Sequence, residues 1–142
     1  MTARSLHILL LEDHADSAFA FSRVLASDGH KVSVARTVRE AERLCSNHHT
    51  FDLLLCDIEL PDGQGYGVLK LLQANSPQTQ GVIVSAHDDK AHRDTAKAEG
   101  YAAYLVKPVT ADLLNMTILR VTQPASELAS SDAGHQPPPT QL

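Results

Sequence analysis

Residues 51–57 read Phe-Asp-Leu-Leu-Leu-Cys-Asp, a short apolar run (51–56) that ends in a carboxylate. The large apolar residues of this run follow one another instead of alternating with polar ones. A strand covered on both faces has this pattern, because a parallel sheet lies between two layers of helices. Four further runs have the same character, at residues 6–11, 32–35, 81–85 and 102–106. The five runs predict five buried strands.

The segments between and after these runs carry apolar residues at helical spacing and predict five helices. Thr37 and Glu40 have the spacing of a capping box that opens the second helix. Gly29 and Gly100 stand where the first and fourth helices should end. The residues predicted to face the core are Ala15, Ala18, Phe19, Ser22 and Leu25; Val38, Ala41 and Cys45; Leu69 and Leu72; Ala91, Thr95 and Ala98 within a helix at 88–99; and Leu114, Ile118 and Val121.

Strands that alternate with helices predict an α/β domain with right-handed crossovers. We expect a doubly wound five-stranded parallel sheet flanked by helices on both faces. This domain should span residues 1–122. Residues 123–142 contain four of the seven prolines and few large apolar residues, so we expect a disordered tail or linker there.

Composition narrows the function classes. The net charge of −5 gives no support to a nucleic-acid or anionic-membrane partner. The first apolar stretch, residues 8–11, is too short for a signal peptide or a membrane span. Cys45 and Cys56 have no metal-knuckle or redox spacing and are expected to be buried free thiols. The chain is therefore expected to be cytoplasmic.

Reactive side chains follow the predicted strands at the edge where doubly wound sheets form their sites. Glu12 and Asp13 follow the first run, Asp57 follows the third, Ser85 ends the fourth, and Lys107 follows the fifth. The second run is followed by nothing comparable. Carboxylates are the ligands that Mg²⁺ selects, and a lysine and a hydroxyl can neutralise and bind a transferring phosphoryl group. A carboxylate can also attack phosphorus to form an aspartyl-phosphate.

Five landmarks in this order resemble the receiver domains of bacterial response regulators and hybrid histidine kinases. They are Glu12-Asp13, Asp57-Ile-Glu-Leu-Pro, Ser85-Ala86, Tyr104-Leu-Val and Lys107-Pro108. The resemblance covers about residues 6–122 and implies the flavodoxin-like receiver fold. The loop after Asp57 departs from the commoner form, because Pro61 stands where Met usually precedes Asp-Gly.

The resemblance implies a Mg²⁺ (or Mn²⁺) site beside the phosphoacceptor. Asp57 matches the phosphoacceptor and a metal ligand, and Asp13 matches the residue that ligates the metal directly. Glu12 matches its neighbour that acts through water, and Glu59 matches the position whose backbone carbonyl completes the metal shell.

The resemblance also implies a phosphoryl-binding set and a switch. Ser85 and Lys107 match the residues that bind the phosphoryl oxygens, and Ala86 matches the small residue that leaves room for them. Tyr104 is similar to the aromatic switch that turns inward together with Ser85. The bond between Lys107 and Pro108 is expected to be cis.

The partner implied by the resemblance is a histidine kinase or a histidine phosphotransfer protein. The protein would then be a signalling phosphoacceptor and not an enzyme in its own right. It could stand alone or be a fragment of a hybrid histidine kinase, and it could pair as a homodimer through the face between the fourth helix and the fifth strand.

Other interpretations of these residues remain open. Asp57 could cap a loop, Glu12 and Asp13 could cap the first helix, and Tyr104 could be core. The chain could be a pseudo-receiver that only binds a partner, or a flavin-binding relative, although an acidic first loop would repel phosphate. Gly63, Gly65 and Gly67 do not have dinucleotide-binding spacing and are interpreted as loop flexibility, and His48 and His49 as solvated side chains.

Overall fold

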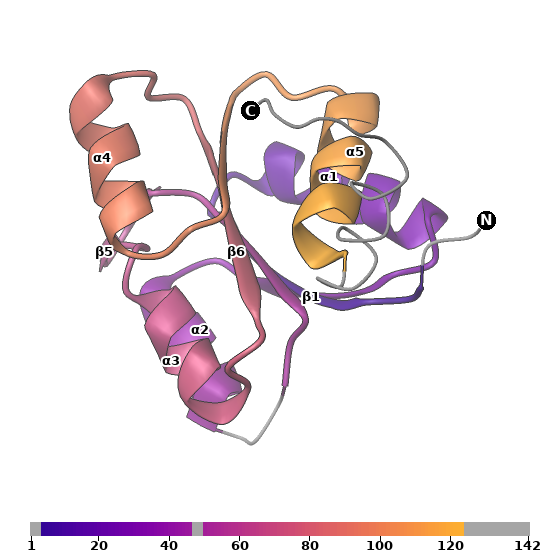
Figure 1. Ribbon diagram of the computed structural model, residues 1–142, viewed down its shortest axis with the longest axis horizontal. Coiled ribbons are helices and arrows are strands. Elements are labelled where there is room, and N and C mark those ends of the chain that lie inside the picture. Colours follow the sequence, from indigo (N-terminus) through magenta and orange to yellow (C-terminus); the bar gives the residue numbers. More distant parts are fainter. Residues whose placement is uncertain (1–3, 47–49, 124–142) are drawn as a thin grey trace, which may run out of the picture.

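The computed structural model describes residues 4–46 and 50–123. Its main sheet has five parallel strands in the order β2-β1-β3-β6-β7. Helices α1 and α5 cover one face of this sheet, and α2, α3 and α4 cover the other (Figure 1). The predicted doubly wound α/β fold is confirmed. In chain order the elements are β1 His7–Leu11, α1 Ala15–Ser27, β2 Lys31–Ala35, α2 Val38–Ser46, β3 Leu53–Cys56, β4 Glu59–Leu60, β5 Gly63–Gln64, α3 Val68–Asn75, β6 Gln80–Ser85, α4 Lys90–Ala98, β7 Ala103–Val106 and α5 Ala111–Thr122.

The central strands are apolar throughout because each of their faces packs into a separate core. In β3, Leu53 and Leu55 lie in the core beneath α1 and α5. Leu54 and Cys56 lie in the core beneath α2, α3 and α4. All four residues are buried, as a strand between two helical layers requires.

The strand register aligns the carboxyl ends of the strands. Leu11 is paired with both Ala35 and Cys56, and Ser85 with Val106. The residues that follow these ends, Glu12, Asp57 and Lys107, therefore emerge at one edge of the sheet.

Helix ends follow the sequence signals. Gly29 and Gly100 have φ values of +89° and +93°, the left-handed conformation predicted for residues just beyond a helix. Thr37 Oγ1 accepts a hydrogen bond from Glu40 N at 3.0 Å, as in a capping box. The Glu40 carboxylate, however, accepts from Arg36 N at 2.6 Å and not from Thr37 N. The capping box is therefore confirmed only in its Thr37 half.

The predicted face of α4 is wrong, and that of α1 is right for Ala18 and Leu25 but wrong for Ala15 and Phe19. Ala91, Thr95 and Ala98 are all exposed, and α4 buries Ala96 instead. Small side chains give a weak periodic signal, so the sequence could not choose the face of this helix. In α1, Phe19 is 64% exposed, and Arg23 lies over its ring at 5.7 Å.

A two-stranded antiparallel hairpin, β4–β5, was not expected from the sequence. Both of its strands contain only two residues, too few for a periodic pattern. The hairpin leaves the sheet directly after Asp57 and places Asp62 at the start of α2. There the Asp62 carboxylate accepts hydrogen bonds from Val38 N at 2.9 Å and Arg39 N at 3.0 Å.

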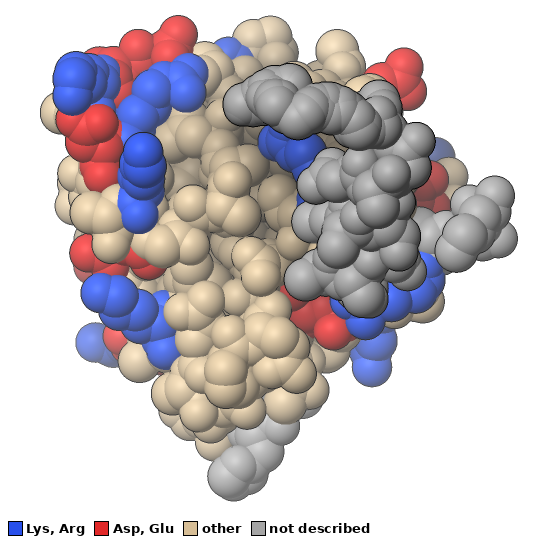
Figure 2. All heavy atoms as spheres, viewed as in Figure 1, with Lys and Arg blue, Asp and Glu red and all other residues tan. Residues whose placement is uncertain are grey.

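Charged side chains of both signs gather over α4, at the upper left of Figure 2. Lys90 pairs with Asp94 at 2.6 Å, and Arg93 pairs with Asp88 in the preceding loop. The outer face of α4 is therefore polar, and this corner of the molecule is tied by surface ion pairs.

Cys45 and Cys56 are buried free thiols, as predicted. Within residues 4–46 and 50–123, no helix is both long enough and apolar enough to cross a bilayer. The predicted tail and the pair His48 and His49 fall on residues 124–142 and 47–49, outside the described residues. The domain boundary at residue 122 stays a prediction.

Candidate functional site: an acidic cleft at the carboxyl edge of the sheet

An open cleft of about 530 Å³ lies at the carboxyl edge of the sheet. Six residues singled out from the sequence line it: Asp13, Asp57, Glu59, Ser85, Ala86 and Lys107. Because they lie at or soon after the carboxyl ends of four parallel strands, the fold itself brings them together.

Lys107 is the cation at the centre of the cleft. Its Nζ donates to Glu12 Oε1 at 2.6 Å and to Asp57 Oδ2 at 3.1 Å. Burial alone would lower the pKa of this lysine, but the hydrogen bonds and negative charges of Glu12 and Asp57 outweigh it and raise the pKa. Lys107 therefore stays charged and links the end of β7 to the ends of β1 and β3.

Three acidic residues and His14 form a compact group of possible metal ligands. One ligand atom from each of Glu12, Asp13, His14 and Asp57 lies within 4.8 Å of the others. Glu12 is 1% exposed and receives a hydrogen bond from His14 N at 3.1 Å. Asp13 Oδ1 is buried and has no hydrogen-bond partner among the described residues. His14 Nδ1 lies 3.5 Å from this oxygen. A buried carboxylate oxygen that accepts no hydrogen bond is suited to a hard divalent cation.

Asp57 is held by the backbone around it. Its Oδ1 accepts a hydrogen bond from Ile58 N at 2.7 Å. Gly65 closes the hairpin onto this strand end, and its N donates to Ile58 O at 2.8 Å. A Cβ at Gly65 would lie 2.6 Å from both Asp57 O and Cys56 Sγ. The interpretation of this glycine as loop flexibility is therefore wrong, because it is required for a close approach.

Ser85 and Tyr104 both contact the backbone of His87. The wholly buried Ser85 accepts from His87 N at 3.1 Å through Oγ. The Tyr104 hydroxyl donates to His87 O at 2.7 Å, and burial raises the pKa of this tyrosine. Tyr104 thus contacts the loop after β6 and also interacts with the Ser85 side chain at the cleft. The peptide bond between Lys107 and Pro108 is cis.

Arg36 was missed from the sequence. The Arg36 guanidinium, directly after β2, donates to Asp13 O through Nη2 at 2.8 Å and Nε at 3.2 Å. The expectation that nothing comparable follows the second strand is therefore wrong. The sequence did contain one signal for Arg36, its position directly after a strand. A cation at that position lies at the same edge of a parallel sheet as the residues that follow the other strands.

Contacts among Glu59, His87 and His92 at the rim of the cleft were not predicted from the sequence. Glu59 contacts His87 through the Oε1 and Nε2 atoms at 3.3 Å, and the His87 ring stacks on that of His92. These residues come from a hairpin, a loop and a helix, and no local spacing connects them.

Known proteins are similar to this chain in both sequence and fold. Residues 8–119 match the family model of the response regulator receiver domain. The transcriptional regulatory protein CitT of Bacillus subtilis is 32% identical over 127 residues, which cover 88% of this chain and 56% of that protein. The luminescence regulatory protein LuxO of Vibrio campbellii is 31% identical over 120 residues, 84% of this chain and 26% of that protein. The chain thus spans about half the length of the first relative and a quarter of the second.

Solved structures agree with this assignment. A CheY-like receiver domain from Methanospirillum hungatei superposes with a TM-score of 0.75 at 25% identity, covering 91% of this chain and all of that one. The receiver domain of a sensor histidine kinase from Pseudomonas aeruginosa gives 0.75 at 24% identity, covering 85% of this chain and all of that one. The latter structure has a magnesium ion coordinated in its active-site cleft. The chain belongs to the response regulator receiver domain family of two-component signalling.

Proposed function

We propose that this receiver domain takes a phosphoryl group from a phosphohistidine onto Asp57 in a reaction that depends on Mg²⁺ or Mn²⁺. The donor would be a histidine kinase or a histidine phosphotransfer protein. The observation that carries the proposal is the position of Lys107, which contacts both Asp57 and Glu12 in a cleft that also holds a buried Asp13 oxygen with no hydrogen bond from the described residues.

The acidic residues fit a divalent cation. Asp13 and Asp57 would bind it through carboxylate oxygens, Glu59 through its backbone carbonyl and Glu12 through water. Two carboxylates and a carbonyl leave positions for water and for phosphoryl oxygens, the usual environment of Mg²⁺ in phosphoryl transfer. When bound, the cation neutralises charge on the transferring group.

The side chains of the cleft would then divide the chemistry. An oxygen of Asp57 forms the bond to phosphorus while the P–N bond of the donor breaks, and the histidine nitrogen keeps the electron pair. Lys107 exchanges its contact with Asp57 for one with a phosphoryl oxygen, and Glu12 holds its ammonium in place. The small, exposed side chain of Ala86 leaves room for the phosphoryl group.

Release of the His87 backbone would transmit the change. If Ser85 turned its hydroxyl to the phosphoryl group, its bond from His87 N would be lost. The loop that also holds the Tyr104 hydroxyl would then be free to move. The surface formed by α4 and β7 is therefore the part we expect to present to a partner, or to a second copy of the chain.

The wider setting is also a proposal. The two buried free thiols support a reducing compartment, so we place the protein in the cytoplasm. The chain would act as a phosphoacceptor that controls another module or protein, including the case of a hybrid histidine kinase.

Intact-protein mass spectrometry tests the assignment. The protein is incubated with Mg²⁺ and a small acyl phosphate, beside an Asp57→Asn variant and an EDTA control. We expect one phosphoryl group on the wild type only, and only with the metal. A folded wild type that remains unmodified, also with a phosphohistidine donor, would overturn the proposal and favour a pseudo-receiver.

A further inference from the structure

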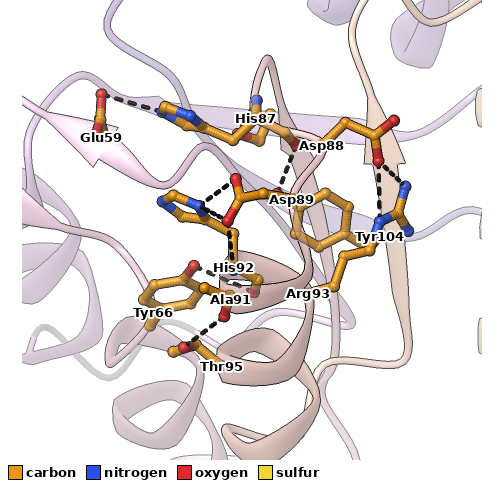
Figure 3. Close-up of polar contacts among 11 residues, drawn as sticks. Glu59, Tyr66, His87, Asp88, Asp89, Ala91, His92, Arg93, Thr95 and Tyr104 are labelled. Carbon is orange, nitrogen blue, oxygen red and sulfur yellow. Dashed lines mark hydrogen bonds and ion pairs between the residues drawn. The ribbon is translucent and has the colours of Figure 1, made fainter.

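Glu59, His87 and His92 meet at the rim of the cleft, outside the acidic group (Figure 3). One ligand atom from each lies within 4.8 Å of the others. Glu59 stands on β4, His87 in the loop after β6 and His92 in the first turn of α4. Glu59 thus meets two histidines that are five residues apart but lie on different elements.

We propose that these three side chains form a second metal site, which binds a borderline divalent transition-metal ion such as Zn²⁺. Two imidazoles and a carboxylate are donors that Zn²⁺ accepts, whereas Mg²⁺ prefers oxygen alone. The proposal does not depend on phosphorylation of Asp57.

The separation of Glu59 and His87 suits this ion. Adjacent ligands of a tetrahedral zinc site lie about 3.3 Å apart, as bonds of roughly 2.0–2.1 Å require. Glu59 Oε1 and His87 Nε2 are 3.3 Å apart. The rings of His87 and His92 are parallel, with centroids 4.3 Å apart and an interplanar angle of 9°. Because each nitrogen lone pair lies in the plane of its ring, the partly exposed His87 ring must turn out of this stack before both nitrogens can bind one ion.

Asp89 orients His92 as a metal ligand. His92 Nδ1 lies 2.6 Å and 2.8 Å from the two carboxylate oxygens of Asp89. A carboxylate at Nδ1 stabilises the tautomer that carries its proton there, and this leaves the lone pair of Nε2 for a metal. Asp89 is also the N-cap of α4, since Oδ2 accepts from His92 N at 3.1 Å. The residue before the helix therefore fixes the direction of the ring.

A bound ion would cross-link the segments that carry its ligands. Tyr104 donates to His87 O, and Tyr66 donates to His92 O at 3.3 Å. Occupancy would therefore restrain the start of α4 together with two tyrosine contacts. Because the ion binds the folded chain, it should also raise the melting temperature.

Calorimetric titration of the full chain with Zn²⁺, in excess Mg²⁺ that occupies the acidic group, tests the proposal. We expect one equivalent of Zn²⁺ in the wild type. His87→Gln, His92→Gln and Glu59→Gln should each weaken binding at least tenfold. Asp89→Asn should weaken it about 10–100-fold, as loss of a carboxylate behind a ligating histidine does, while Asn preserves the helix cap.

Two control variants separate this site from its surroundings. Asp57→Asn should retain the Zn²⁺ equivalent, and Asp94→Asn, which removes an exposed carboxylate of α4, should also retain it. Melting curves without metal verify that each variant is folded. The proposal is overturned if the wild type binds no Zn²⁺, if the His87→Gln/His92→Gln double variant binds it unchanged, or if Asp57→Asn abolishes binding.

Discussion

The ammonium of Lys107 lies 2.6 Å from a Glu12 carboxylate that is only 1% exposed. Its contact with Asp57 is longer, at 3.1 Å. Glu12 is therefore the residue that holds the lysine, and Asp57 can exchange its contact for another without leaving the ammonium unpaired. This arrangement suits a site in which Asp57 changes its charge and shape.

Removal of the Lys107 charge should destabilise the fold. Lys107→Met leaves the buried Glu12 without its ion partner, and this should lower the free energy of unfolding by roughly 1–3 kcal/mol. The loss is smaller than for a fully buried ion pair because the lysine is partly exposed. Urea unfolding measures the loss. The Glu12→Gln/Lys107→Met double variant should recover part of it, and two independent, additive losses would contradict the pairing.

The alkaline limit of stability offers a second measurement on the same lysine. The pKa of Lys107 is higher in the folded state than in the unfolded state. Its contribution to the free energy of unfolding is therefore complete below the pKa of the unfolded state, and it is lost as the pH rises through the pKa of the folded state. Wild type should therefore lose stability relative to Lys107→Met as the pH increases above about 10.4. A stability difference that is constant across this range would contradict the raised pKa.

Asp57→Asn should abolish phosphorylation and leave the fold intact. The amide keeps an oxygen that can accept from Ile58 N, and Lys107 retains Glu12. Loss of one of several crowded carboxylates also relieves repulsion, so we expect melting without metal to be unchanged or slightly higher. Added Mg²⁺ should stabilise the wild type more than the variant. Asp112→Asn, on an exposed turn of α5, is the matched control and should behave as wild type.

Gly65→Ala should be strongly destabilising, because its Cβ would lie 2.6 Å from the carbonyl oxygen of Asp57. The backbone must shift, and overpacking of this kind costs about 1–3 kcal/mol. Gly67→Ala is the matched control two residues away. Gly67 has helical angles, φ −72° and ψ −11°, and a Cβ added there would meet no atom within 4 Å. Thermal melting should separate the two variants, and equal effects would contradict the proposed close approach.

The fold and most of the acidic cleft could be predicted because they rest on local patterns. Buried runs marked the strands, and the parallel topology then placed Asp13, Asp57, Ser85 and Lys107 at one edge. The placement of side chains at strand ends can be predicted without knowledge of long-range contacts, since the strand register aligns these ends.

The remainder depends on contacts that local spacing does not encode. The buried face of α4 is set by where Ala96 meets the core, and the alternatives Ala91 and Thr95 are chemically too similar to distinguish. The role of Arg36 depends on the ends of β2 and β1 lying side by side, because only then does its guanidinium reach Asp13 O. The group of Glu59, His87 and His92 likewise arises only when the hairpin folds against α4.

Asp62 provides a test of the unexpected hairpin. Hydrogen bonds from Val38 N and Arg39 N lower the pKa of its carboxyl group, so the ionised form stabilises the start of α2. Because the pKa of Asp62 is lower in the folded state, its contribution to stability is present above the pKa of the unfolded state, about 3.9. This contribution is lost as the pH falls through the pKa of the folded state. Asp62→Ala should therefore melt below wild type at neutral pH, and the difference should shrink in acid. Asp62→Asn keeps an acceptor for the same amides and should therefore melt above Asp62→Ala. The margin between these two variants should be smaller than that between wild type and Asp62→Ala, and it should not depend on pH. If Asp62→Ala melts as wild type does at neutral pH, the contact between the hairpin and α2 contributes nothing to the fold.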